Sequence, residues 1–180
     1  MELLRDKGYD VLCMTDNVDE FTVRMLNQYK EKTFKSIADG DLGLETEEEK
    51  EEIKKQAEEH ASVLTAIKDA LGDKVARVQL TGRLKSHPCC LSTEGGMSLE
   101  MEKVLNQQAM GTEQTFHAER VLELNGAHPI FDKLCALAGS DTDKLAKLSS
   151  VLYNQALLIE GMPIDNPVEY ANAVCSLLTD

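Results

Sequence analysis

The sequence predicts an α+β protein in which helices cover a small mixed sheet and the chain closes with a helical hairpin. Short apolar runs bounded by Gly, Pro or Asn are typical of strands. Longer segments with apolar residues at steps of three and four are typical of helices, and two of these occupy the last forty residues. Hydrophobic residues make up 42% of the 180 residues but aromatic residues only 4%, so we expect a largely aliphatic core.

Residues 1–40 are expected to form a small α/β piece. Tyr9–Met14 is a short apolar run with the character of a buried strand. Thr15–Asn17 suits a turn and a helix cap, and Val18–Tyr29 has the spacing of a helix. Thr33–Ile37 is a second strand candidate, before a break at residues 40–45.

An acidic helix is predicted at residues 46–71. Thr46 and Glu49 form a capping box, and glutamates in the first turn suit the positive end of the helix dipole. Gly72 is expected to end the helix. We interpret the charge run as a solvated face rather than a binding tail, and His60 as a half-buried packing residue rather than a ligand. One stripe carries Ile53, Ala57, His60, Leu64, Ile67 and Leu71.

The middle of the chain alternates strands and helices. Strand-like sequence is expected at 75–80, at 89–92 and at 120–124, the last ending in the turn signal Asn125–Gly126. Helices are expected at 98–110 and at 128–138, with Gly139 ending the second.

The closing hairpin has more apolar surface than one seam requires. Its first helix should run from Asp141 or Thr142 to Glu160, and its second should begin at Asn166–Pro167. The surplus surface could pack on the rest of the chain, or on a second copy as an intermolecular four-helix bundle. The residues alone leave both possibilities open. The candidate dimer-interface residues are Leu145, Leu148, Leu152, Ala156, Ile159, Val168, Ala171, Val174, Cys175, Leu177 and Leu178.

The helix at 98–110 carries a methionine-containing stripe. Met97, Met101, Val104 and Leu105 share one face, while Glu100, Glu102, Lys103 and Gln107 occupy the other. The stripe fits either a core-facing surface or an adaptable surface that contacts client proteins. Gly95–Gly96, just before it, would let the helix move.

The sequence contains no recognisable catalytic or metal-binding motif. A phosphate-binding loop, a nucleophile elbow and HExxH are absent, and the four histidines lack ligand spacing. The five cysteines form no CxxC pair, and we interpret Cys89–Cys90 as small buried hydrophobes rather than a thiol-dependent active site. A net charge of -13 argues against nucleic-acid or membrane partners. We therefore expect neither an enzyme nor a metal site.

Four ordered segments resemble the carboxyl-terminal part of the ninety-kilodalton heat-shock chaperone family, in its bacterial HtpG-type form. They are VLCMTDNVDEFTVRMLNQYKEKTFKSI (11–37), VQLTGRLKSHPCCLSTEGGMSLEMEKVLNQQA (78–109), VLELNGAHPIFDKL (121–134) and LYNQALLIEGMPIDNPVEYANAVCSLL (152–178). The first resembles the end of that family's middle domain. The third is similar to its ELNxxHP motif, and the last to its closing hairpin.

The resemblance implies a cytoplasmic, homodimeric, ATP-dependent chaperone whose last two helices dimerise. It implies that residues 1–40 are the end of the middle domain and that residues 46–180 form the dimerisation domain. It also places Met97, Met101, Val104 and Leu105 on a helix implicated in client binding. ATP and Mg would bind upstream domains, so this segment should hydrolyse nothing. The ending Leu177–Asp180 lacks the MEEVD tail of eukaryotic members, so tetratricopeptide co-chaperones are not expected. The alternative is a monomeric adaptor whose hairpin covers itself.

Overall fold

The structure is a computed structural model of the whole chain, and it describes residues 4, 6–16, 18–37, 42–109 and 115–179. It is α+β, as predicted. Two compact units divide it: Met1–Leu44 with Ser92–Glu119, and Glu45–Leu91 with Arg120–Asp180. Strands β4 (Cys89–Glu94) and β5 (Glu119–Leu124) each run through a boundary between the two.

The first unit contains little buried apolar surface in its amino-terminal part. Helix α2 (Asp19–Leu26) buries none of its residues. It is followed by a hairpin of two short antiparallel strands, β1 (Gln28–Tyr29) and β2 (Lys32–Thr33). The positive φ angles of Lys30 and Glu31, 46° and 66°, form the turn between them. The later part of this unit contributes helix α5 (Leu99–Gln108).

Three predictions for the first forty residues were wrong in detail. Tyr9–Met14 forms no strand, and Leu12 is 72% exposed; an apolar run becomes a strand only where a neighbour pairs with it. The predicted helix 18–29 ends at Leu26, where Asn27 takes a positive φ of 57°. The predicted strand 33–37 shrinks to Lys32–Thr33. Asn17 and Met110, at the edges of predicted elements, lie outside the described residues.

The second unit begins with two helices where the sequence predicted one. Helix α3 (Glu47–Glu59) ends at His60, and α4 (Ala61–Leu71) starts directly after it. The capping box at Thr46 and Glu49 is confirmed. Gly72 ends α4 with a φ of 58°, and a short 3₁₀ turn, η1 (Gly72–Lys74), leads to the sheet. The predicted stripe faces inward: Ile67 and Leu71 are buried and its other members are half-buried.

The sheet has the strand order β3-β5-β4, where β3 spans Arg77–Leu80. β3 and β5 are parallel, with Arg77 opposite Val121 and Leu80 opposite Leu124. The central strand is almost fully enclosed: Val121, Leu122, Glu123 and Leu124 are at most 1% exposed. Such burial is typical of a parallel strand covered on both faces.

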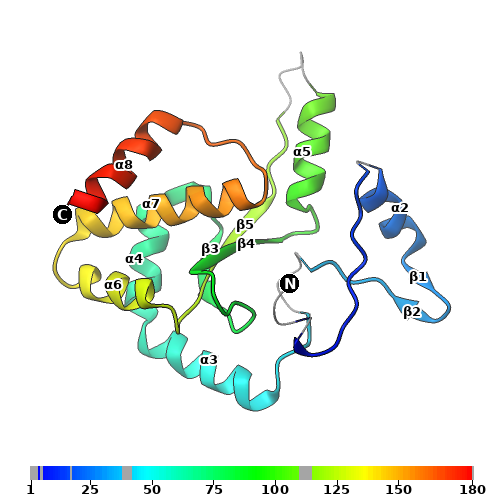
Figure 1. Cartoon of the computed structure of the whole chain (residues 1–180), viewed down its shortest axis with the longest axis horizontal. Helices are drawn as coiled ribbons and strands as arrows, with labels where there is room; N and C mark the ends of the chain where they lie inside the picture. Colours follow the sequence, from blue (N-terminus) through cyan, green and yellow to red (C-terminus); the bar gives the residue numbers. More distant parts are fainter. Residues whose placement is uncertain (1–3, 5, 17, 38–41, 110–114, 180) are drawn as a thin grey trace. The chain divides into compact units, whose positions relative to one another are not determined.

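Three further helices complete the second unit: α6 (Pro129–Ala138), α7 (Thr142–Ile159) and α8 (Pro167–Thr179). Helix α7 contacts α4, α6 and α8, as Figure 1 shows. The predicted caps are present, since Asp141 accepts from the amide of Lys144 and Asn166 from that of Glu169. The aliphatic core of this unit includes Ile67, Leu122, Leu124, Leu134, Leu145 and Leu152.

Candidate protein-interaction surfaces

Four of the predicted interface residues on α7 lie inside the protomer's own core. Leu145, Leu148, Leu152 and Ala156 are 2%, 5%, 1% and 1% exposed. They lie on the helix that contacts α4 and α6, so the protomer itself already covers their side chains. These four candidate dimer-interface residues are therefore not on the protomer surface. Periodicity alone cannot show which apolar side of a helix packs against its own chain.

The remaining predicted residues lie at the end of α7 and along α8, and most of them are exposed. Ile159, Val168 and Leu178 are 63%, 70% and 82% exposed. Ala171 and Cys175 are exposed, and Val174 and Leu177 are half-buried. None of the residues in Pro167–Thr179 is buried. Helix α8 therefore lies on the surface of its unit and presents several apolar side chains to solvent.

One exposed apolar neighbour of these residues was not among the predicted interface residues. Leu158 is 51% exposed beside Ile159. The apolar run Leu157–Ile159 at the end of the helix could have indicated it. Adjacent residues on a helix point to different sides, so one core cannot cover all three. Leu157 is buried, so the run divides between the core and the surface.

A polar contact holds the two helices of the hairpin together. The ammonium group of Lys147 on α7 donates to the hydroxyl of Ser176 on α8 at 2.9 Å. Gly161 ends the turn after α7 with a φ of 68°, a backbone conformation that favours glycine. The hairpin predicted from the last forty residues is therefore present in the protomer.

Helix α5 places its predicted contact residues at different depths. Met97, Met101 and Leu105 are half-buried, whereas Val104 is buried at 6% exposed. Val104 therefore packs inside the protomer, and contact of this face with client proteins stays a prediction. The three remaining side chains stay partly open to solvent, as an adaptable contact surface requires.

The polar face predicted for α5 was wrong at Glu102, which is only 3% exposed. Its Oε2 accepts from the amide of Ala118 at 2.9 Å, and its Oε1 lies 3.9 Å from Nδ1 of His117. One turn later, the side-chain amide of Asn106 donates to the carbonyl of Phe116 and accepts from its amide. Hydrogen bonds to the returning chain explain why a carboxylate is buried here.

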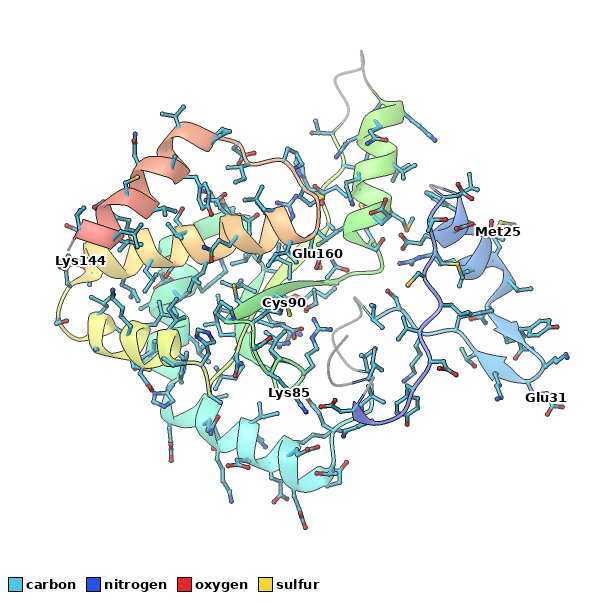
Figure 2. The ribbon with its side chains drawn as sticks, viewed as in Figure 1. Met25, Glu31, Lys85, Cys90, Lys144 and Glu160 are labelled. Atoms are coloured by element: carbon cyan, nitrogen blue, oxygen red, sulfur yellow. The ribbon has the colours of Figure 1, made fainter. Side chains whose placement is uncertain are left out.

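The vicinal thiols lie in a packed environment. Cys89 is buried, and its Sγ lies 3.4 Å from the carbonyl oxygen of Leu152. Burial raises the pKa of the Cys89 thiol to about 12, and the neighbouring Cys90 adds to this. Cys90 is labelled in Figure 2. Burial also raises its pKa, to about 11, although Arg83 opposes the shift. Because a thiolate is the reactive form, these pKa values favour the packing interpretation.

A buried ion pair accompanies Cys90. The Nε of Arg83 donates to Oε2 of Glu123 at 2.7 Å, and Gln79 donates to the other carboxylate oxygen at 3.2 Å. Glu123 is 0% exposed. On balance the pKa of Arg83 is raised: burial lowers it, and Cys90 and Glu123 together more than offset that. The strand pattern at 120–124 gave no signal of this pair, because Glu123 looks there like an ordinary strand residue.

His60 packs as the sequence analysis expected. It is half-buried at the break between α3 and α4, and its ring meets the ring of Phe131 edge-on at 5.2 Å. Its Nδ1 lies 3.6 Å from Sγ of Cys135. Within the described ranges, no three His, Cys, Asp or Glu side chains gather as a metal would need. Nor does any described helix have the length and apolarity to cross a membrane.

Comparison with known proteins identifies the class to which this chain belongs. The family model described as Hsp90 protein matches residues 1–180. The chain therefore belongs to the Hsp90 family, as the resemblance of its four segments implied.

Curated relatives point to one type of member. The chain is 48% identical over 177 residues to the chaperone protein HtpG of Clostridium perfringens (strain 13 / Type A). It is 49% identical over 177 residues to the protein of that name from Clostridium acetobutylicum, and 44% over 177 residues to that from Bacillus subtilis (strain 168). Each match covers 98% of this chain and 28% of the relative. The chain thus spans little more than a quarter of these relatives' length.

Proposed function

We propose that this segment joins two copies of a longer Hsp90-family chaperone, through a four-helix bundle made by the α7–α8 hairpins of both copies. The observation that carries the proposal is the exposure of α8. Its thirteen residues include none that is buried, and Val168 and Leu178 are 70% and 82% exposed. An amphipathic helix that leaves apolar side chains in water on a folded unit favours a further partner.

A second copy of the same hairpin is the simplest partner. Under two-fold symmetry the same patch of both protomers forms the interface, so each exposed leucine of the patch is buried in both copies. The described contributors, Leu158, Ile159, Val168 and Leu178, lie on the end of α7 and on α8. Joining two protomers in this way would hold the rest of each chain at a high effective concentration.

The test replaces exposed and buried leucines of the hairpin in parallel. Leu178→Asp should produce monomers that keep the wild-type helix content, because the side chain is 82% exposed in the protomer. Leu152→Asp should instead unfold the second unit, because that side chain is 1% exposed and its site would bury a charge. Leu12→Asp, at a 72% exposed leucine of the first unit, is the matched control and should stay dimeric.

Sedimentation velocity across a micromolar concentration series separates these outcomes. A Leu178→Asp variant that remains dimeric, while Leu12→Asp does too, contradicts the proposed interface. A wild-type chain that is monomeric throughout the series instead supports the monomeric adaptor.

We also assign client contact to the open side of α5. Met101 and Leu105 are half-buried there, and methionine adapts its shape to different partners. Met101→Ser should weaken the capture of an unfolded client while leaving the melting temperature near wild type. Gln107→Ser, at an exposed position of the same helix, should change neither. A large fall in melting temperature for Met101→Ser would show that this side chain belongs to the core.

The remaining roles of the parent protein lie outside this segment in our proposal. ATP and Mg would bind elsewhere in the longer chain, and this segment would contribute no catalytic group. We propose a cytoplasmic homodimer that holds unfolded or partly folded clients, without nucleic-acid, membrane or tetratricopeptide partners. Titration of Mg-ATP into the 180-residue chain should give no saturable heat, and a saturable isotherm would contradict this division of roles.

A further inference from the structure

The first turn of α5 is held by two charged side chains of α2, within the first unit. The carboxylate of Glu20 accepts a hydrogen bond from the hydroxyl of Ser98, the residue that caps α5. Arg24, one turn further along α2, donates from Nη1 to the carbonyl of Gly96 at 2.8 Å. These two contacts flank Met97, so helix α2 holds the chain on both sides of the first methionine of the proposed client surface.

Glu20 and Arg24 also fix each other. Both Nε and Nη2 of Arg24 lie 3.1 Å from Oε1 of Glu20. A glutamate four residues before an arginine is a favourable order on a helix. The guanidinium fork therefore serves the carboxylate and the Gly96 carbonyl together, which a lysine ammonium could not do with the same geometry.

Two glycines adjoin the part of the chain that these contacts hold. Gly95 and Gly96 both have positive φ angles, 78° and 88°. A Cβ atom placed on Gly96 would meet no atom within 4 Å, so packing does not require glycine there. The backbone conformation does require glycine, since residues with a side chain seldom adopt a positive φ. Two such residues in succession lie one residue before the helix cap Ser98, where a change in backbone angles would redirect the start of α5.

From Glu102 onward, α5 has an attachment of its own. Glu102 and Asn106 bind the returning segment at Phe116 and Ala118. Releasing α2 would therefore leave α5 anchored from Glu102 onward and free only the residues before it. Met97 and Met101 lie in that freed part, whereas Leu105 lies in the anchored part.

We infer that Glu20 and Arg24 form a latch on Gly96 and Ser98 that restrains the start of α5, and that opening it lets this end turn about Gly95–Gly96. Its use rests on the proposed client contact, because it would set how far Met97 and Met101 are presented. The latch is partly solvated, with side chains 22% and 42% exposed at Glu20 and Arg24. Salt therefore weakens it, and a partner that takes the place of α2 could open it.

Hydrogen–deuterium exchange on the 180-residue chain tests the latch. Arg24→Ala should speed exchange in the first turn of α5, at the amides of Met101 and Glu102, by about 12-fold, the lower limit for losing a hydrogen bond to a charged group. Arg24→Lys and Glu20→Gln should give smaller increases, since each keeps part of the contact. Lys50→Ala is the matched control: it removes an exposed pair with Glu47 on α3 and should change nothing in α5.

Unchanged exchange in the first turn of α5 for both Arg24→Ala and Glu20→Gln would overturn the inference. Acceleration spread evenly over the first unit, residues 115–119 included, would also overturn it, because the contact would then support the whole unit. The client proposal fails on a different readout, unchanged client capture by Met101→Ser. Faster α5 exchange together with unchanged capture would therefore keep the latch and remove the client surface.

Discussion

Replacing Arg83 with alanine should strongly destabilise the second unit, because the buried carboxylate of Glu123 would lose its cationic partner. Glu123 is 0% exposed, and Nε of Arg83 lies 2.7 Å from its Oε2. Removing one partner of a buried pair costs about 3–5 kcal/mol. The Arg83 side chain is itself 12% exposed and Gln79 still donates to Glu123, so we expect the lower limit, about 3 kcal/mol.

That loss is a large share of the roughly 5–15 kcal/mol that stabilises a typical domain. For a chain of this size it corresponds to a fall in melting temperature of about 6–12 °C. Urea unfolding followed by circular dichroism measures the free energy directly. Lys50→Ala, which breaks an exposed ion pair, should change it by at most about 0.5 kcal/mol.

A double-mutant cycle tests the physical reason for this loss. Glu123→Gln removes the buried charge, so Arg83→Ala should cost less in that background than in the wild type. The difference between the two costs is the coupling energy of the pair. A cost below about 1 kcal/mol for Arg83→Ala alone would refute the reasoning. So would strict additivity in the cycle, since it would show that the two groups do not depend on each other.

Three further predictions concern the thiols and a helix cap. At pH 8 the exposed Cys13 and Cys175 should react with iodoacetamide at least about 100-fold faster than Cys90, whose pKa is raised to about 11; equal rates would contradict its burial. Folding raises the thiol pKa of Cys89 to about 12, so the unfolded chain releases this proton at lower pH than the folded chain does. The free energy of unfolding should therefore be unaffected by this group below the unfolded pKa near 9, and should fall by about 1.4 kcal/mol per pH unit from there towards pH 12. Alkaline urea melts that show no such slope would refute it. Thr46→Ala should lower the free energy of unfolding by about 1 kcal/mol, and Thr46→Ser should restore most of it.

Local hydrogen-bonding signals in the sequence predicted the structure well. The capping box at Thr46 and Glu49, the stop at Gly72 and the start of α8 at Pro167 depend on neighbouring residues only. A pattern of a few consecutive residues contains all the information that such features need. Element positions in the second unit followed for the same reason.

Features that depend on distant partners could not be predicted in this way. Tyr9–Met14 has the composition of a strand but forms none. Glu102 occupied the polar side of a helical pattern, and its burial follows from a hydrogen bond to Ala118 sixteen residues away. The continuous stripe at 46–71 gave no sign of the break at His60.

The hairpin shows the same limit for the candidate site. Periodicity identified the apolar residues of both helices, but not which of them the protomer would cover itself. Leu152 and Leu178 look equivalent in sequence, yet one is 1% and the other 82% exposed. The distinction depends on the contacts of α7 with α6, the preceding helix, and with α4, which lies far away in the chain.

The molar mass of the 180-residue chain in solution tests the proposed dimer most directly. Light scattering at micromolar concentrations should give twice the mass of one chain, and Leu178→Asp should return it to a single chain without loss of helix signal. A single-chain mass for the wild type at every concentration would contradict a bundle formed by two hairpins.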